Sequence, residues 1–290
     1  MKAGIRKRLA ATAAALSVSA AILVSAPGTG SAAAATPSLR AFGITGDGTL
    51  MATFTTDRPT SLDWVQQIMG LSGDTRLLDL DNRVQNGLLY GLGDKGGIYT
   101  IKTPPQVSNV TVTKVSQLQV PLYGSNFGFD FNPAADRLRV VSDNGQNLRH
   151  NLNDHTTVED TTLTTPPSTG PTRGVTASGY TNNDLVAATG TLLYGIDTTK
   201  DTLVLQAPAN NGTLSTVGSL GFDAQPNAGL DIFSYLSGGK TTSVAAFASL
   251  TPYGASTPTL YSVNLVTGEP TAIGRFPLNI TSLAVTLTGS

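Results

Sequence analysis

A segment of about 50 residues repeats along this chain, and that repetition restricts the possible folds more than any other feature. Residues 81–96 align without a gap on residues 130–145, an offset of 130 − 81 = 49. The matched pairs fall at turn and core positions: Asp81 with Asp130, Leu89 with Leu138, Asp94 with Asp143, and Gly96 with Gly145. Looser copies follow around residues 193–197 and 260–264. A repeat of this length predicts a fold made of stacked copies of one supersecondary unit.

The clearest copy contains four short apolar runs with turn residues between them. We predict strands over 127–131, 138–142, 147–152 and 157–163. The first turn contains Asn132 and Pro133, and the second contains Asn144 and Gly145, a pair that tolerates the positive φ of a tight hairpin. Four antiparallel strands in each repeat are typical of a β-propeller blade.

The repeats begin near Leu77, Phe127, Val175, Ala228 and Asn279, which predicts an all-β propeller of about five four-stranded blades. Six blades are the alternative because region 174–276 is long enough to hold another unit, and a β-sandwich is the alternative architecture.

The two chain ends are expected to share one blade. Residues 279–287 supply a single strand before the chain ends, and residues 39–56 supply only two. Pairing them would close the ring and cover two sheet edges that would otherwise be exposed. Residues 61–68 could form a helical turn, but their place in the repeat favours an outer strand that contains Trp64.

The composition agrees with an all-β fold and excludes several classes of protein. Only two of the 290 residues are Glu, and 13% are charged, which argues against a helical bundle and against a charged disordered chain. The absence of Cys excludes disulfides, thiol catalysis and Cys-ligated metals.

The first 35 residues have the layout of a bacterial secretory signal. A basic start (Lys2, Arg6, Lys7 and Arg8) precedes an apolar stretch over 9–24 and a run of small residues over 31–35. The alternative is a retained anchor, but about 16 residues rich in Ala and Ser are fewer than the roughly 20 apolar residues of a span. We therefore expect a secreted or envelope-associated protein in which residues 36–290 form a single propeller domain.

The net charge of this domain argues against a nucleic-acid partner. Removal of the four basic residues leaves 18 − 4 = 14 Lys and Arg against 19 Asp and Glu, a net charge of −5. No cluster of Lys or Arg offsets this negative charge, so we expect no nucleic-acid partner. No second apolar segment follows the first, so we expect no membrane span after cleavage.

Several stretches resemble one bacterial family, called domain of unknown function 4394. The most specific is the run Gly128–Arg149, and the others are 88–93, 180–184, 191–197 and 210–218. The resemblance covers about 50–231 and implies an exported protein with propeller-like repeats, without implying an activity. One departure is visible: the turn after Asp81 reads Asn-Arg-Val and lacks the proline expected there.

Three aspartates are the candidate binding residues. Asp81, Asp130 and Asp231 occupy like positions in the first strands of three repeats, and these strands surround the channel of a propeller. Their carboxylates would converge near its mouth, where oxygen ligands suit Ca²⁺ or Mg²⁺. The alternative is structural: each Asp accepts backbone N–H bonds, or pairs with Arg137, Arg139 or Arg149, and so ties neighbouring blades together.

Catalytic motifs are scarce in this sequence. His150 and His155 are its two histidines and could pair on a metal, but their polar neighbours favour surface positions. No Gly-x-Ser-x-Gly motif is present. Tyr90, Tyr194 and Tyr261 recur at like positions and are expected to pack between blades.

Three functions of different classes remain open. A binding or scaffold propeller would present loops to a protein, glycan or small ligand. A metal-dependent hydrolase or lactonase would hold its ion on Asp130 and its counterparts. An envelope structural protein would need no small ligand. Because general acid–base chemistry usually recruits His or Glu, the composition favours the binding function over the enzyme.

Overall fold

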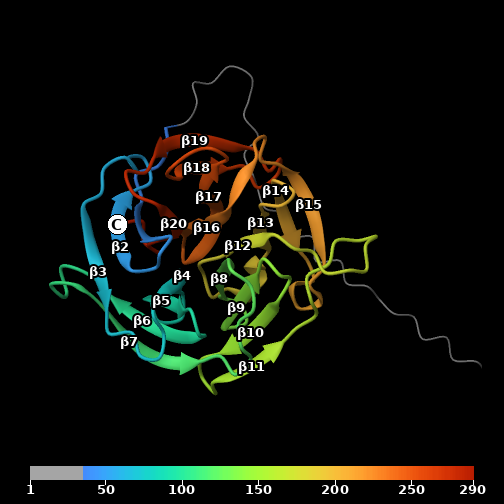
Figure 1. The fold of residues 1–290 in the computed structure, drawn as a ribbon, viewed down its shortest axis with the longest axis horizontal. Coiled ribbons are helices and arrows are strands. Elements are labelled where there is room, and N and C mark those ends of the chain that lie inside the picture. Colours follow the sequence, from blue (N-terminus) through green and yellow to red (C-terminus); the bar gives the residue numbers. More distant parts are fainter. Residues whose placement is uncertain (1–34) are drawn as a thin grey trace, which may run out of the picture.

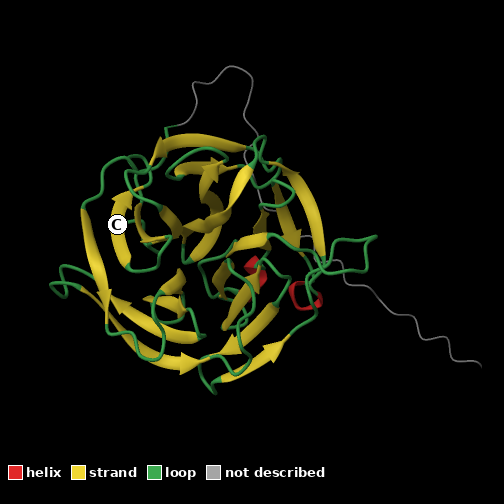
Figure 2. Ribbon diagram, in the orientation of Figure 1, coloured by secondary structure: helices red, strands yellow, loops and turns green. Residues whose placement is uncertain are grey.

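The computed structural model describes residues 35–290 and is all-β, apart from two 3₁₀ turns, η1 (Ala187–Thr189) and η2 (Ala209–Asn211). The predicted signal segment therefore lies outside the described residues except for Ala35. Figures 1 and 2 show sheets arranged around a central axis in a propeller-like ring, without the two stacked layers of a sandwich. Among the described residues, no helix has the length and apolarity that a membrane crossing requires.

Eight of the 20 strands of the ring form one sheet, ordered β20-β1-β2-β3-β7-β6-β5-β4. Its members are β1 (Arg40–Thr45), β2 (Leu50–Thr55), β3 (Trp64–Met69), β4 (Leu77–Arg83), β5 (Leu88–Gly93), β6 (Gly97–Lys102), β7 (Val110–Gln117) and β20 (Ile280–Val285). Pairing is antiparallel throughout, except where β3 meets β7 in parallel over two residue pairs. The segment that contains Trp64 is a strand, as the repeat predicts.

Three sheets of four strands complete the ring. The first contains β8 (Phe127–Asn132), β9 (Arg137–Ser142), β10 (Asn147–Asn151) and β11 (Thr156–Glu159). The second contains β12 (Val175–Tyr180), β13 (Leu193–Asp197), β14 (Thr202–Gln206) and β15 (Leu214–Ser219). The third contains β16 (Ala224–Ser237), β17 (Lys240–Pro252), β18 (Thr259–Val263) and β19 (Pro270–Arg275). The four strands predicted from residue 127 onward are all present, although β11 ends earlier than expected.

Both ends of the described chain meet in one sheet. Strand β20 pairs antiparallel with β1, with Ala41 opposite Val285 and Gly43 opposite Leu283. The Arg40 backbone N–H also donates to the Gly289 carbonyl at 3.1 Å. This pairing is the ring closure that the short terminal segments predict, and it gives β1 a partner on each side.

Five strands surround the axis: β20, β4, β8, β12 and β16, each in contact with the next around the circle. Apolar side chains fill the space between adjacent sheets. Tyr90 of β5, for example, packs edge-on against Phe131 of β8 with ring centroids 5.1 Å apart. Tyr90, Tyr194 and Tyr261 are all buried, in agreement with the prediction that they pack between repeats.

Candidate metal centre

The sequence places one aspartate at the same level of three axial strands, and the structure brings these aspartates together. Asp81 of β4, Asp130 of β8 and Asp231 of β16 are buried, and one carboxylate oxygen from each lies within 4.8 Å of the other two. The corresponding positions of the two remaining axial strands carry no carboxylate, because β12 has Gly179 and β20 has Ala284 there. The convergence predicted for these three residues is therefore present.

Backbone N–H groups of the next axial strand hold these carboxylates. Asp81 accepts from the Phe131 N–H at 2.8 Å, and Asp231 accepts from the Val285 N–H at 2.5 Å. Each also accepts from the N–H of the residue that follows it, at 2.6 Å in both cases. The structural alternative of backbone hydrogen bonds thus holds for Asp81 and Asp231. A carboxylate oxygen has two lone pairs, so these bonds leave acceptor capacity toward the axis.

Arginine does not compensate the cluster. Arg139 and Arg149 both pair with Asp160, at 2.7 and 3.0 Å, and Arg137 donates to the Ala135 carbonyl. Among residues 35–290, none of the ion pairs includes Asp81, Asp130 or Asp231. Of the two structural alternatives, pairing with arginine is therefore wrong: these arginines lie on second and third strands, where Arg139 and Arg149 reach Asp160 and Arg137 reaches a backbone carbonyl.

A fourth carboxylate lies two residues before Asp81 on the same strand. Asp79 is buried, accepts the Phe129 N–H at 2.9 Å, and accepts the Ser282 hydroxyl of β20. The sequence reasoning missed it, although an Asp-x-Asp pattern puts both side chains on one face of a strand. Asp79 lies outside the group of three whose oxygens converge.

Burial and mutual repulsion raise the pKa values of these carboxyl groups and so oppose their ionisation. Burial raises the pKa of Asp79 to about 7 and the pKa of Asp231 to about 6. Burial, followed by the charge of Asp231, raises the pKa of Asp81 well above its usual value. Burial, followed by the charges of Asp81 and Asp231, does the same to the pKa of Asp130. Like charges packed this closely must share protons or a cation.

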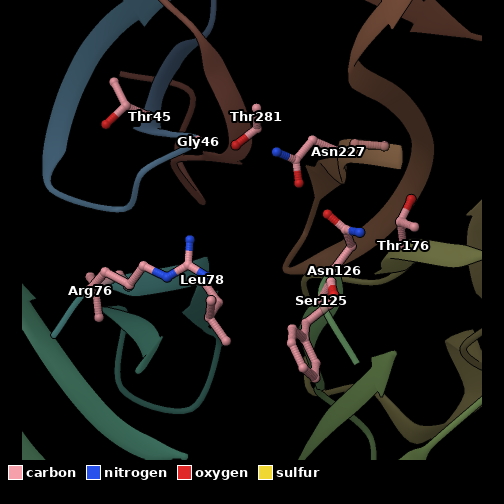
Figure 3. Close-up of a pocket in the computed structure, with 12 residues that line it drawn as sticks. Thr45, Gly46, Arg76, Leu78, Ser125, Asn126, Thr176, Asn227 and Thr281 are labelled. Atoms are coloured by element: carbon pink, nitrogen blue, oxygen red, sulfur yellow. The ribbon is translucent and has the colours of Figure 1, made fainter. Parts of the chain in front are cut away.

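A small polar cavity of about 30 Å³ lies at one end of the axis (Figure 3). Its wall includes Phe127, Thr176 and Thr281, each in the first two residues of an axial strand, together with Ala228 of β16 and Arg76. The aspartates follow three residues later on their strands, about 10 Å further along at the rise of a β-strand. A space of this size admits a water or an ion, whereas pockets for organic ligands are roughly ten times larger or more.

The two histidines differ from the sequence expectation in one respect. His155 is exposed as predicted, but His150 is fully buried, so its predicted surface position is wrong. The reason is packing between repeats: β7 of the preceding unit covers this part of β10, and Ser116 of β7 contacts both histidines at 2.8 Å.

Comparison with known proteins gives a family and a fold. The family model described as Domain of unknown function (DUF4394) matches residues 50–284. No curated protein matches the sequence.

Several solved structures are similar at low sequence identity. A glutaminyl cyclase from Myxococcus xanthus is 15% identical, with 77% of this chain and 87% of that chain covered and a TM-score of 0.46. A protein of unknown function from Bacteroides thetaiotaomicron is 12% identical, with 86% and 61% covered and a TM-score of 0.50. The WD40 domain of a Toxoplasma gondii coronin is 12% identical, with 79% and 55% covered and a TM-score of 0.39. At such identities the likeness concerns the fold alone.

Proposed function

The chain belongs to the Domain of unknown function (DUF4394) family, and because that description assigns no activity, we propose a function from the chain's own geometry. We propose an exported five-bladed propeller that binds a divalent cation in its channel and serves as a binding or scaffold module outside the cell. The single observation that carries the cation is the convergence of three buried carboxylates that no Lys or Arg of the described residues neutralises.

The count of five blades rests on where the eight-stranded sheet divides. Its two halves, β20-β1-β2-β3 and β4-β5-β6-β7, are joined as one sheet only by the parallel strand pairs Ile68–Val110 and Met69–Thr111. Every other neighbouring pair in the ring is antiparallel and runs over four or more residue pairs. Division at this contact gives two four-stranded units, which join the three separate sheets.

The spacing of the carboxylates suits a cation. Ca²⁺ binds oxygens at about 2.3–2.6 Å, so two ligands on opposite sides of the ion lie about 5 Å apart. Oxygens that all lie within 4.8 Å of one another can therefore contact one ion. We favour Ca²⁺ over Mg²⁺, because backbone hydrogen bonds fix these carboxylates and Ca²⁺ tolerates irregular ligand geometry better.

A cation here would stabilise the ring from its centre. The three ligands come from β4, β8 and β16, which belong to three different sheets. An ion that binds them together opposes separation of these sheets, and it replaces the repulsion between carboxylates with attraction. The small size of the adjacent cavity favours this binding role over the hydrolase alternative, which would need room for an organic substrate beside the ion.

Calorimetry and thermal unfolding of the purified protein test this proposal. Titration with Ca²⁺ should release or absorb heat with a stoichiometry of one, and saturating Ca²⁺ should raise the unfolding midpoint by several degrees relative to protein with EDTA. Asp130→Asn should abolish both effects. Asp79→Asn is the matched control, since it removes a buried carboxylate from the same channel outside the convergent group. A wild-type protein that gives neither heat nor a shift with Ca²⁺ or Mg²⁺ would show that protons, and no cation, neutralise the cluster.

A further inference from the structure

A second polar cluster lies at the outer side of the ring, where β7 of one unit meets β10 and β11 of the next. The two histidines of the chain, His150 of β10 and His155 of the β10–β11 turn, both contact the hydroxyl of Ser116 on β7. The His150 Nε2 and the His155 Nδ1 each lie 2.8 Å from the Ser116 Oγ. A serine between two imidazoles has the composition of an activated nucleophile.

The hydrogen bonds around His150 indicate the direction of the protons. Thr157 Oγ1 accepts the Gln119 backbone N–H at 2.9 Å and lies 2.9 Å from His150 Nδ1. When the Thr157 hydroxyl donates to Nδ1, a neutral His150 carries its proton on Nε2 and can donate it to Ser116 Oγ.

In that tautomer the Ser116 Oγ accepts from His150, and its hydroxyl can donate to the other partner at 2.8 Å, His155 Nδ1. Burial lowers the pKa of His150 to about 4, which keeps this ring neutral near pH 7. The exposed imidazole is then the proton acceptor for Ser116, and the buried one is its hydrogen-bond donor.

Backbone geometry turns both groups toward each other. A β-bulge at Val115 interrupts the pairing of β6 with β7: Tyr99 faces Lys114, and Ile98 faces Ser116. Such bulges reorient the side chain that follows. His155 holds a φ of 60°, an uncommon conformation for a residue other than glycine, and its ring reaches Ser116 from this turn.

The cluster borders solvent. An open hollow of about 500 Å³ is lined by residues 114–119 and by His155. Ser116 itself is 8% exposed, whereas His155 is exposed. The hollow is open to solvent, and its location is distinct from the channel cavity.

We propose that Ser116 is a nucleophile for acyl transfer from small carboxylic esters, with His155 as its general base. The Ser116 Oγ attacks the ester carbonyl carbon and forms a C–O bond, while its proton passes to His155 Nδ1. The bond to the leaving alkoxide then breaks, and this alkoxide takes the proton from His155. A water molecule attacks the acyl-serine with His155 again as base, which releases the carboxylic acid and restores the hydroxyl.

A fluorophosphonate probe tests the nucleophile directly on the purified protein. Its phosphorus forms a bond to a reactive serine oxygen and loses fluoride, and peptide mass spectrometry locates the label. We expect the label on Ser116, and a loss of the label in Ser116→Ala. The matched control Ser215→Ala removes a serine from an outer strand with no histidine partner and should label like wild type.

The base is tested by His155→Gln, a change in an exposed turn. General bases contribute 10²–10⁴-fold, so we expect labelling of Ser116 and hydrolysis of p-nitrophenyl acetate to fall about 100-fold. The thermal midpoint should stay within about a degree, which a purely structural role of His155 would not allow. The proposal is overturned if wild type carries no label on Ser116, or if His155→Gln labels and hydrolyses at the wild-type rate. Should Ser116→Ala fail to fold, these two outcomes still decide it.

Discussion

The carboxylates of the channel aspartates and of Asp160 are all buried, but only Asp160 is paired with arginine side chains of the chain itself. Asp160 accepts from Arg139 at 2.7 Å and from Arg149 at 3.0 and 3.1 Å. The channel holds three converging carboxylates with no such partner. Since the sequence can supply arginine to a buried acid, the unpaired channel cluster points to a partner that comes from solution, either protons or a cation.

The largest change in the free energy of unfolding should come from removing an arginine that pairs with Asp160. Arg139 is 2% exposed and also donates to Asn147 and Asn210, at 2.8 and 2.6 Å. Arg139→Met removes its charge and leaves buried acceptors unpaired, so we expect a loss of about 3–5 kcal/mol in the free energy of unfolding. Urea unfolding with EDTA and with Ca²⁺ should show the same loss in both. A loss that Ca²⁺ repairs would mean that the two regions are coupled.

The pH dependence of the channel should have the opposite sign to ordinary acid denaturation. The pKa values of Asp79 and Asp231 are raised in the folded protein, to about 7 and about 6. Between the unfolded value near 4 and these values, the folded state binds more protons, so stability falls as pH rises, by about 1.4 kcal/mol per pH unit for each group. Below pH 4 this contribution is fully present.

Ca²⁺ should remove the part of this decline that comes from Asp231, because it binds the ionised carboxylates of the convergent group that protons would otherwise neutralise, and it should leave the part from Asp79. Unfolding followed from pH 4 to pH 8, with EDTA and with Ca²⁺, measures both curves. If stability falls with pH equally with EDTA and with Ca²⁺, the proposal that Ca²⁺ binds in the channel is wrong.

Removal of one negative charge should have opposite effects on stability in the channel and at Asp160. With EDTA at pH 8, Asp130→Asn relieves repulsion among unpaired carboxylates and should stabilise the protein by about 1–2 kcal/mol. Asp160→Asn removes the partner of two arginines and should destabilise it. Equilibrium unfolding of both variants gives the comparison, and a destabilised Asp130→Asn without cation would mean that the hydrogen bond from the Tyr180 backbone N–H to Asp130 outweighs the repulsion.

The smallest effect is expected at the surface. Arg40 and Asp63 form a pair at 3.5 Å with side chains 43% and 49% exposed. Water and salt screen such a pair, so Asp63→Asn should change the free energy of unfolding by less than about 0.5 kcal/mol. This variant sets the baseline for unfolding measurements on the others, and a larger loss would place Asp63 among the contacts that hold β1.

The repeat made the axial strands and their aspartates predictable, because an offset of 49 residues puts Asp81 and Asp130 at one level of the ring. The burial of His150 was not predictable in the same way. Its cover is Ser116, which lies 34 residues away in another unit, and a repeat describes each unit more directly than the contact between units. The length of the β16–β17 hairpin also escaped prediction, since its tip at Gly238 and Gly239 extends beyond the common unit.

The pairing of β20 with β1 also has a consequence in time. A ribosome releases residue 41 long before residue 285, so one edge of β1 has no partner until β20 has been synthesised. Contacts between such distant parts of a sequence form slowly. During that interval the propeller ring is open, and the unpaired edge of β1 is exposed to proteases and to pairing with strands of other polypeptides. Loss of β20 would leave this edge of β1 permanently without its partner.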